Sequence, residues 1–215
     1  MRIGILGSGL MGGKLGTLFA RARHEVVFSY ARSERKLKRL AREAGEGARA
    51  GTPADAARES DVLLLAVHWS RVDDVLKKTG SLERKVVMSC SLPMNANDTG
   101  LAVAHTSSGA EVLAKKLRGA HFVSAFGTVP SEVLFDVFER RRRAKRPTLV
   151  YSGDDKRAKA VAAQLIRDVG FEPLDAGPLR IARYTEPFTL LIAQLAYEGD
   201  RGPEMAYRFE WMGKE

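Results

Sequence analysis

Residues 7–12 constrain the possible folds of this chain more than any other segment, because they match the pattern G-x-G-x-x-G. The apolar run 2–7 precedes them and the amphipathic run 9–22 follows them, so the loop joins a strand to a helix. In that context the glycines allow a tight turn, let a pyrophosphate approach the backbone and let the helix pack against the strand. The free N–H groups at the start of the helix then face the phosphates. We expect dinucleotide binding here rather than a glycine-rich turn without a ligand. The residues concerned are Gly7, Ser8, Gly9, Leu10, Met11 and Gly12.

Short apolar runs alternate with amphipathic runs along most of the chain. We expect strands at 2–7, 25–30, 61–67, 85–91, 121–126 and 147–153, and a last short strand at 171–177. We expect helices at 9–22, 33–45, 70–80, 109–117, 131–143, 154–170 and 182–199. The alternation predicts an α/β fold with a doubly wound (Rossmann), mostly parallel sheet, followed by a smaller C-terminal α/β part that ends in an apolar helix.

The end of the second predicted strand indicates which dinucleotide is bound. An NAD-binding unit usually has an acidic residue at this point for the ribose hydroxyls, but no acid lies within residues 26–33. A guanidinium can hold a 2′-phosphate with two hydrogen bonds, so Arg32 predicts a preference for NADP. Ser29 and Tyr30 could add hydroxyl donors, and Lys36 is a further cation nearby. The alternative is that these cations are only the exposed first turn of a helix.

We predict two parts of the chain, with a soft boundary near Pro147. Residues 1–147 would form the NADP-binding domain. Residues 148–215 would form the second part, in which the apolar helix is a core or dimer element. An alternative role for that helix is to contact a partner protein.

The composition limits the cellular location and the classes of binding partner that we expect for this chain. The longest apolar run, residues 62–67, is too short to span a bilayer, and the N-terminus does not read as a signal peptide. Cys90 is the single cysteine, so we expect a cytoplasmic protein. The net charge of +9 raises nucleic acid as a partner, but no nucleic-acid motif is recognisable, and we expect none. The basic run 139–146 is either a solvated helix end or a site for an anionic ligand tail.

The chain offers few side chains for acid–base chemistry. His68 and Trp69 follow the third predicted strand, where the nicotinamide half should lie, although Trp69 could equally be a packing residue. No His, Cys or carboxylate spacing suggests a metal site, and no nucleophile stands beside a base, so we predict no catalytic side chain and no metal. Direct hydride transfer between two bound cofactors fits this shortage, because it depends on positioning.

Five segments together resemble the deazaflavin-dependent NADP oxidoreductases, which pass a hydride between NADPH and coenzyme F420. They are the glycine loop, "VHW" at 67–69, "SLP" at 91–93, "AFGTVP" at 125–130 and "LDAGPL" at 174–179, and the likeness runs from Met1 to about Phe209. The resemblance implies a homodimer or higher oligomer and a substrate cleft between a nucleotide-binding domain and a smaller C-terminal part. Residues 148–215 would complete that cleft and provide the dimer interface. The co-substrate it implies is coenzyme F420.

The resemblance also implies roles for individual positions. Ala66, Val67, His68 and Ser89 would border the nicotinamide riboside. Trp69, Gly127, Thr128, Val129, Pro130 and Leu179 would line the side that takes the hydride acceptor. The chain departs from the family at Phe126–Gly127, where a polar Asn or His is common, and at the turn 30–32. The alternatives are therefore an NADPH-dependent reductase of a flavin, an imine or another small substrate, and a non-catalytic module that senses NADPH.

Overall fold

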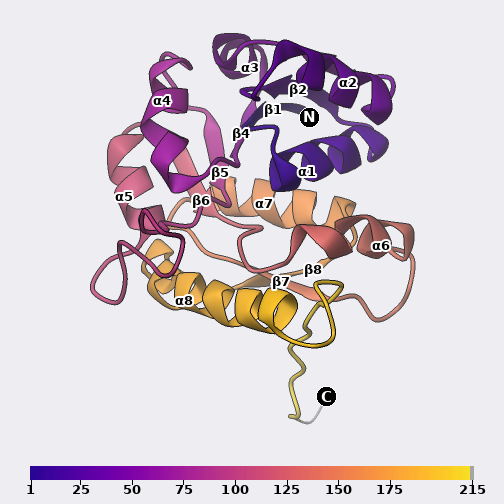
Figure 1. The fold of residues 1–215 in the computed structure, drawn as a ribbon, viewed down its shortest axis with the longest axis vertical. Helices are drawn as coiled ribbons and strands as arrows, with labels where there is room; N and C mark the ends of the chain where they lie inside the picture. The colour runs from indigo at the N-terminus through magenta and orange to yellow at the C-terminus, as the bar shows by residue number, and fades with distance from the viewer. Residues whose placement is uncertain (214–215) are drawn as a thin grey trace.

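The computed structural model describes residues 1–213 and places a parallel sheet at the centre of the molecule (Figure 1). Its strands run in the order β3-β2-β1-β4-β5-β6. They are β1 (Arg2–Leu6), β2 (Glu25–Ser29), β3 (Ala48–Ala50), β4 (Val62–Leu65), β5 (Val86–Ser89) and β6 (His121–Ser124). Leu6, the last residue of β1, is level with Ser29 of β2 and Leu65 of β4. The carboxyl ends of the central strands therefore form one edge, where ligands bind in sheets of this kind.

Helices cover both faces of this sheet. They are α1 (Leu10–Arg21), α2 (Glu34–Ala44), α3 (Pro53–Glu59), α4 (Val72–Lys77), α5 (Gly109–Lys116), α6 (Leu134–Glu139), α7 (Lys156–Asp168) and α8 (Ala182–Ala193). Short helical turns are η1 (Trp69–Arg71), η2 (Ser131–Val133), η3 (Leu179–Ile181) and the π-type turn η4 (Gln194–Glu198).

Alternate strand residues supply two apolar cores, one on each face. Ile5 of β1 packs in a first core with residues of α1, α2, α6 and α7, whereas the next residue, Leu6, packs in a second core with residues of α3, α4 and α5. Strands buried on both faces read as unbroken apolar runs, which is why β4 was recognisable in the sequence. The predicted doubly wound α/β fold is confirmed.

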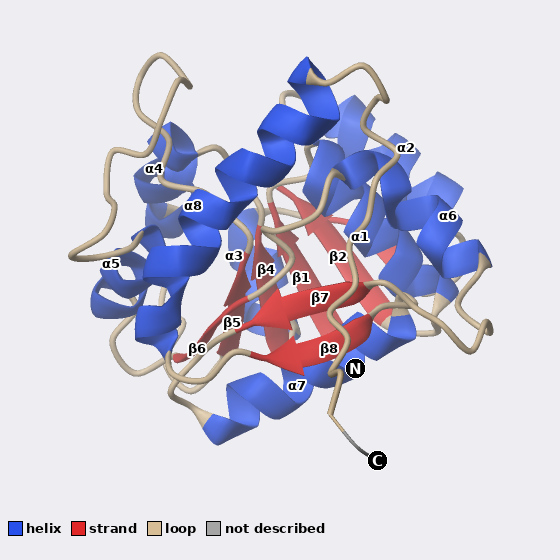
Figure 2. Ribbon diagram, turned by 90° about the horizontal axis from the view of Figure 1, so that it is seen from below, coloured by secondary structure: helices blue, strands red, loops and turns tan. Residues whose placement is uncertain are grey.

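The C-terminal part forms a second, smaller sheet of β7 (Thr148–Tyr151) and β8 (Glu172–Asp175), which are parallel and joined by α7 (Figure 2). A bridge between Ser124 and Ser152 attaches it to the end of β6. Buried side chains on both sides of Pro147, such as Phe19 and Phe171, share the first core. The boundary at residue 147 stays a prediction.

The last described segment lies along β7. The Thr148 amide donates to the Tyr207 carbonyl over 2.8 Å, and the Phe209 amide donates to the Thr148 hydroxyl over 3.0 Å. The Tyr207 ring meets Phe188 and Phe209 edge-on. Within residues 1–213, none of the helices has both the length and the apolar character needed to cross a membrane.

Two elements, β3 and α3, were not predicted from the sequence, and one helix was predicted to be longer than it is. β3 has only three residues, all at least partly exposed, so it carries no apolar run. α3 has a recognisable start, because Thr52 and Asp55 form a capping box ahead of Pro53. The helix expected at 131–143 ends at Glu139. Between Phe138 and Leu149 the chain has no large apolar side chain to bury, so nothing holds the basic run in a helix.

Candidate functional site

The glycine loop turns tightly between β1 and α1 at the carboxyl edge of the sheet. Gly7 has a φ of +114°, and a Cβ on it would lie 2.5 Å from the Ala66 carbonyl oxygen. A Cβ on Gly12 would collide with the Gly7 carbonyl oxygen. At Gly9 a Cβ would meet nothing within 4 Å, so the backbone there borders open space. The loop thus has the compact form that brings a phosphate close to the backbone.

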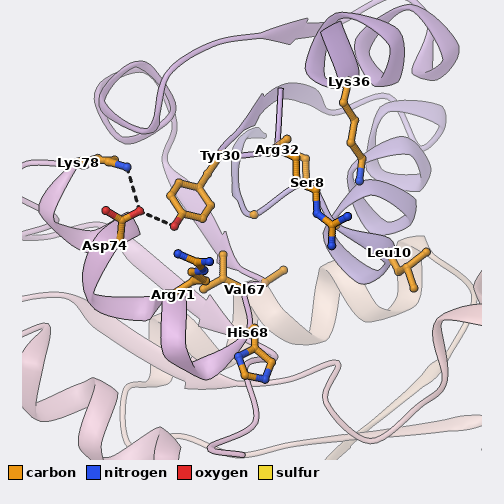
Figure 3. Close-up of a pocket in the computed structure, with 14 residues that line it drawn as sticks. Ser8, Leu10, Tyr30, Arg32, Lys36, Val67, His68, Arg71, Asp74 and Lys78 are labelled. Atoms are coloured by element: carbon orange, nitrogen blue, oxygen red, sulfur yellow. Dashed lines mark hydrogen bonds and ion pairs between the residues drawn. The ribbon is translucent and has the colours of Figure 1, made fainter. Parts of the chain in front are cut away.

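A cavity of about 750 Å³ opens beside this loop (Figure 3). Ten of the fourteen residues predicted to bind the cofactor line it. They are Gly7, Ser8, Gly9, Leu10, Tyr30, Arg32, Lys36, Ala66, Val67 and His68. The structure therefore brings together segments as far apart in the chain as Gly7 and His68. Its volume lies in the range typical of ligand-binding pockets.

Two cations form one wall of this first cavity. The Arg32 and Lys36 side chains extend toward the same space above the glycine loop (Figure 3). Within residues 1–213 neither forms an ion pair, whereas the neighbouring Lys38 pairs with Glu34. Ser33 caps α2 by accepting a hydrogen bond from the Lys36 amide. The first turn of α2 is thereby fixed, and it holds Lys36 toward the cavity.

The predicted role of Ser29 does not fit the geometry. Ser29 is fully buried, and its hydroxyl donates to the Ile5 carbonyl over 2.7 Å. Its own carbonyl accepts hydrogen bonds from the Gly7 amide and the Ser8 hydroxyl. Ser29 therefore holds the glycine loop against β2 and has no free donor for a phosphate. Met11 packs against the first core, and neither it nor Gly12 lines the cavity.

The opposite wall of the first cavity is a polar network that was not predicted. The Tyr30 hydroxyl donates to Asp74 Oδ2 over 2.5 Å, and Lys78 Nζ donates to the same oxygen over 2.9 Å (Figure 3). Burial and the bond to Asp74 raise the pKa of Tyr30 to about 12. The bonds from Tyr30 and Lys78 lower the pKa of Asp74, so this carboxylate stays charged.

Arg71, the last residue of η1, lines the first cavity beside this network. The sequence did contain a signal for these residues. Arg71, Asp74 and Lys78 fall at spacings of three and four in the predicted helix 70–80, which places them on one helix face. The sequence did not show that this helix face lies against Tyr30 in the cavity wall.

His68 and Trp69 take different directions. His68 Nδ1 lies 2.8 Å from the Ser70 hydroxyl, and its Nε2 lies 2.7 Å from Asp98 Oδ1, so both ring nitrogens have a partner. The ring borders the first cavity. Trp69 packs against the second core and lines neither this cavity nor the one described next. For Trp69 the geometry favours the packing interpretation.

A second, much smaller cavity of about 20 Å³ lies at the carboxyl ends of β5 and β6. It includes three of the predicted residues, Ser89, Gly127 and Thr128. The Thr128 hydroxyl lies 2.7 Å from the Tyr207 hydroxyl. Besides Trp69, three other predicted substrate residues are buried and line neither cavity. Val129 packs in the first core, Leu179 packs in the second, and Pro130 lies just before η2.

One carboxylic acid, Glu186 of α8, lines the second cavity and was not singled out in the sequence. Only 6% of it is exposed. Its two oxygens accept hydrogen bonds from the Gly109 and Ala110 amides at the start of α5, over 2.8 and 2.9 Å. Burial raises the pKa of Glu186 to about 7, against the lowering effect of these two bonds.

The parallel sheet, the glycine loop and the cavity at its carboxyl edge define a dinucleotide-binding α/β protein. Residues 2–93 match the family of coenzyme F420-dependent NADP oxidoreductases. The predicted resemblance to this family is therefore confirmed over residues 2–93.

Known proteins resemble a larger part of the chain. The metalloreductase STEAP3 of Rattus norvegicus is 26% identical over 189 residues, which cover 88% of this chain but only 36% of the rat protein. The chain thus spans about a third of the length of that relative.

The same fold occurs in solved structures. A candidate F420-dependent NADP-reductase of Arthrobacter sp. FB24 has a TM-score of 0.84 at 20% identity, over 97% of this chain and 99% of that one. An imine reductase of Aspergillus terreus, solved in complex with NADPH4, has a TM-score of 0.65 at 19% identity, over 90% and 60% of the two chains. At these identities the likeness establishes the fold.

Proposed function

We propose that this protein is an NADP-dependent oxidoreductase that transfers a hydride between NADP(H) and a second small redox molecule, with the deazaflavin coenzyme F420 as the first choice. The main support comes from Arg32 and Lys36, two cations in the first cavity that form no ion pair within residues 1–213. They stand at the end of β2, where an NAD-binding protein would have a carboxylate. A guanidinium and an ammonium suit a 2′-phosphate, which carries more negative charge than a ribose hydroxyl.

The loop geometry supports the same cofactor. Gly7 and Gly12 leave no room for a side chain, and Gly9 borders open space beside the N-terminus of α1. A pyrophosphate placed there would receive the free N–H groups of the helix. The adenine half of NADP(H) would then lie between the cation pair and the wall of Tyr30 and Arg71. The nicotinamide half would lie toward His68, in the direction of the second cavity.

Three observations support a direct hydride transfer to coenzyme F420. The matching family is that of coenzyme F420-dependent NADP oxidoreductases, and the Arthrobacter protein with the same fold, matched over 99% of its chain, is a candidate F420-dependent NADP-reductase. In addition, among the described residues that line the second cavity, Cys90 is the only His, Cys or Lys that could form a covalent intermediate. Burial raises the pKa of the Cys90 thiol to about 12, so its sulfur stays protonated and is a poor nucleophile.

The basic run after α6 gains no support as a site for the acidic tail of the coenzyme. None of the residues Arg140–Arg143 lines either cavity. Arg141 donates to the Phe138 carbonyl and stacks on the Phe138 ring, and Arg146 pairs with Glu172. These arginines are therefore not assigned a role in binding an anionic tail.

A second copy of the chain is the proposed partner, in line with the predicted homodimer. Tyr184, Leu191 and Leu195 are spaced along one face of α8 and η4 and are 64%, 52% and 50% exposed. Burying such a face against its own copy would remove apolar area from water. We keep the cytoplasm as the proposed location, because the chain has a single cysteine.

One assay tests the proposed activity. The protein is mixed with NADPH and oxidised coenzyme F420, the deazaflavin absorbance is followed, and the assay is repeated with FMN. Loss of deazaflavin absorbance at a rate proportional to protein supports the proposal. Turnover with FMN alone would move the assignment to a flavin reductase. Tight NADPH binding with no turnover of either acceptor would favour the sensing module.

A further inference from the structure

Glu186 is a buried carboxyl group without a cation to neutralise it. The nearest candidate by sequence, Arg183 on the same helix, pairs instead with Glu111 of α5 through two hydrogen bonds of 2.9 and 2.7 Å. Within residues 1–213 Glu186 forms no ion pair, so its charged form would be offset only by two backbone amides. A buried carboxylate with so little compensation favours its protonated form.

The other charged and titratable neighbours do not change this balance. Glu111 opposes a negative charge on Glu186, because it is itself a carboxylate, and Arg183 holds Glu111 in its charged form. The two other titratable groups of the second cavity are Cys90 and Tyr151. Burial raises the pKa of both, so neither exchanges a proton near neutral pH. Glu186 is the one group of this cavity able to do so.

The position of Glu186 links it to the reacting half of the site. The second cavity that it lines also includes Ser89, at the end of β5, and Gly127 and Thr128, beyond the end of β6. These are the predicted positions for the nicotinamide side and for the acceptor. At about 20 Å³ the cavity is large enough for one water molecule, which could carry a proton from the carboxyl group toward the sheet edge.

We propose that Glu186 is the proton source for the hydride acceptor, reached through the second cavity. This inference rests on the proposed function. Reduction of a deazaflavin or an imine by NADPH needs a proton besides the hydride. Glu186 gives up the proton of its O–H bond while the hydride and its electron pair pass from NADPH to a carbon of the acceptor. The electron pair displaced in the acceptor binds that proton at a nitrogen or oxygen. NADP⁺, the reduced acceptor and the Glu186 carboxylate result, and the carboxylate regains its proton from solvent.

The first test compares Glu186→Gln with a matched change at the same helix interface, Glu111→Gln, which does not line the cavity. The turnover number for reduction of coenzyme F420 by NADPH is measured from pH 5.5 to 8.5. For the wild type and Glu111→Gln we expect it to fall about tenfold per pH unit above about pH 7. Glu186→Gln should be about 100-fold slower at pH 6 and independent of pH. Glu186→Asp should restore a pH-dependent rate.

The reverse reaction gives a further discriminating result. Oxidation of reduced F420 by NADP⁺ needs the carboxylate, so its rate should rise with pH in the wild type and stay flat in Glu186→Gln. If Glu186→Gln has a lower melting temperature but an unchanged pH profile in both directions, the group is only an anchor for α5 and the inference is wrong.

A measurement without turnover separates this inference from the proposed function. Isotope-edited infrared spectra at pH 6 should contain the C=O stretch of a protonated carboxyl group that disappears in Glu186→Gln and is retained in Glu111→Gln. Absence of that band contradicts the inference whatever the activity. If the band is present and NADPH binds but neither F420 nor FMN is reduced, the proposed acceptors are wrong. Proton transfer from Glu186 to these acceptors is then wrong as well.

Discussion

The Tyr30 hydroxyl lies 2.5 Å from Asp74 Oδ2, so the end of β2 is tied to helix α4 across the first cavity. Tyr30 has a φ of +55°, a conformation that non-glycine residues adopt only when their surroundings hold them. The bond to Asp74, with Lys78 Nζ placed 5.3 Å from the ring centre, provides that hold. The ring is thus a fixed wall for whatever half of the cofactor lies between β2 and α4.

Removing this hydrogen bond should weaken binding of both nicotinamide cofactors. In Tyr30→Phe the ring keeps its size but loses its bond to a charged acceptor, which is worth about 1.5–3 kcal/mol. We expect the Kd values of NADPH and NADH to rise together, by about tenfold, in fluorescence titrations. A rise confined to NADPH would mean that Tyr30 contacts the 2′-phosphate and not the adenosine.

Arg32 should decide between the two cofactors. In Arg32→Asp a phosphate would lose charge-assisted hydrogen bonds and meet a like charge, so we expect the KM for NADPH to rise by about 100-fold and the KM for NADH to change less than about threefold. The matched control is Arg35→Asp, which makes the same charge change one position into α2 but does not line the first cavity. Equal effects of Arg32→Asp on both cofactors would refute the assignment of NADP.

Two neighbouring glycines should respond oppositely to the same substitution. In Gly12→Ala the new Cβ collides with the Gly7 carbonyl, so the loop must shift, and we expect NADPH binding to fall below detection. In Gly13→Ala the new Cβ meets Leu40 of α2 at 3.5 Å, an ordinary van der Waals distance. Because residue 13 lies inside helix α1, the change to alanine should stabilise the protein by about 0.5–1 kcal/mol. Chemical unfolding and NADPH titration of both variants check this. Unchanged NADPH binding in Gly12→Ala would mean that the close contact between Gly12 of α1 and the Gly7 carbonyl is not needed.

Much of the fold could be predicted because its signals are local. β4 is an apolar run buried on both faces, and the glycine loop lies between a strand and a helix, so each could be read from adjacent residues. β3 carries no such run and was missed. Ser29 was misjudged because its hydroxyl partner, Ile5, lies on the neighbouring strand, and the sequence does not show which face of a strand end is open.

The parts of the site that escaped prediction depend on contacts between distant segments. Asp74 is 44 residues from Tyr30, and Glu186 is 77 residues from Gly109. In the sequence Glu186 is one acid in a mostly apolar helix, next to Pro187. Only the packing of α8 against the start of α5 makes it a buried carboxyl group.

The apolar face of α8 should control the oligomeric state. If a second copy covers Leu191 and Leu195, then Leu191→Glu places a charge in that interface and should shift the protein from dimer to monomer in sedimentation velocity experiments. Arg39→Glu on the exposed side of α2 changes charge without touching an apolar face, and should leave the dimer intact. A wild-type protein that sediments as a monomer at all concentrations would contradict the proposed dimer.

The pH dependence of stability tests the ionisation of Glu186 by itself. Its pKa is raised in the folded protein, from 4.5 to about 7, so the folded state binds the proton more tightly than the unfolded chain does. The stabilisation is therefore fully present below pH 4.5 and is lost as the pH rises through about 7. For this shift it amounts to about 3 kcal/mol.

We expect the difference in unfolding free energy between the wild type and Glu186→Gln to fall by up to this amount between pH 5 and pH 8, measured by urea unfolding at each pH. Glu111→Gln should give the opposite sign. Hydrogen bonds from Arg183 lower the pKa of Glu111, so its contribution is present above the unfolded pKa and is lost on acidification. Parallel pH curves for the wild type and Glu186→Gln would show that Glu186 is ionised in the folded protein throughout this range.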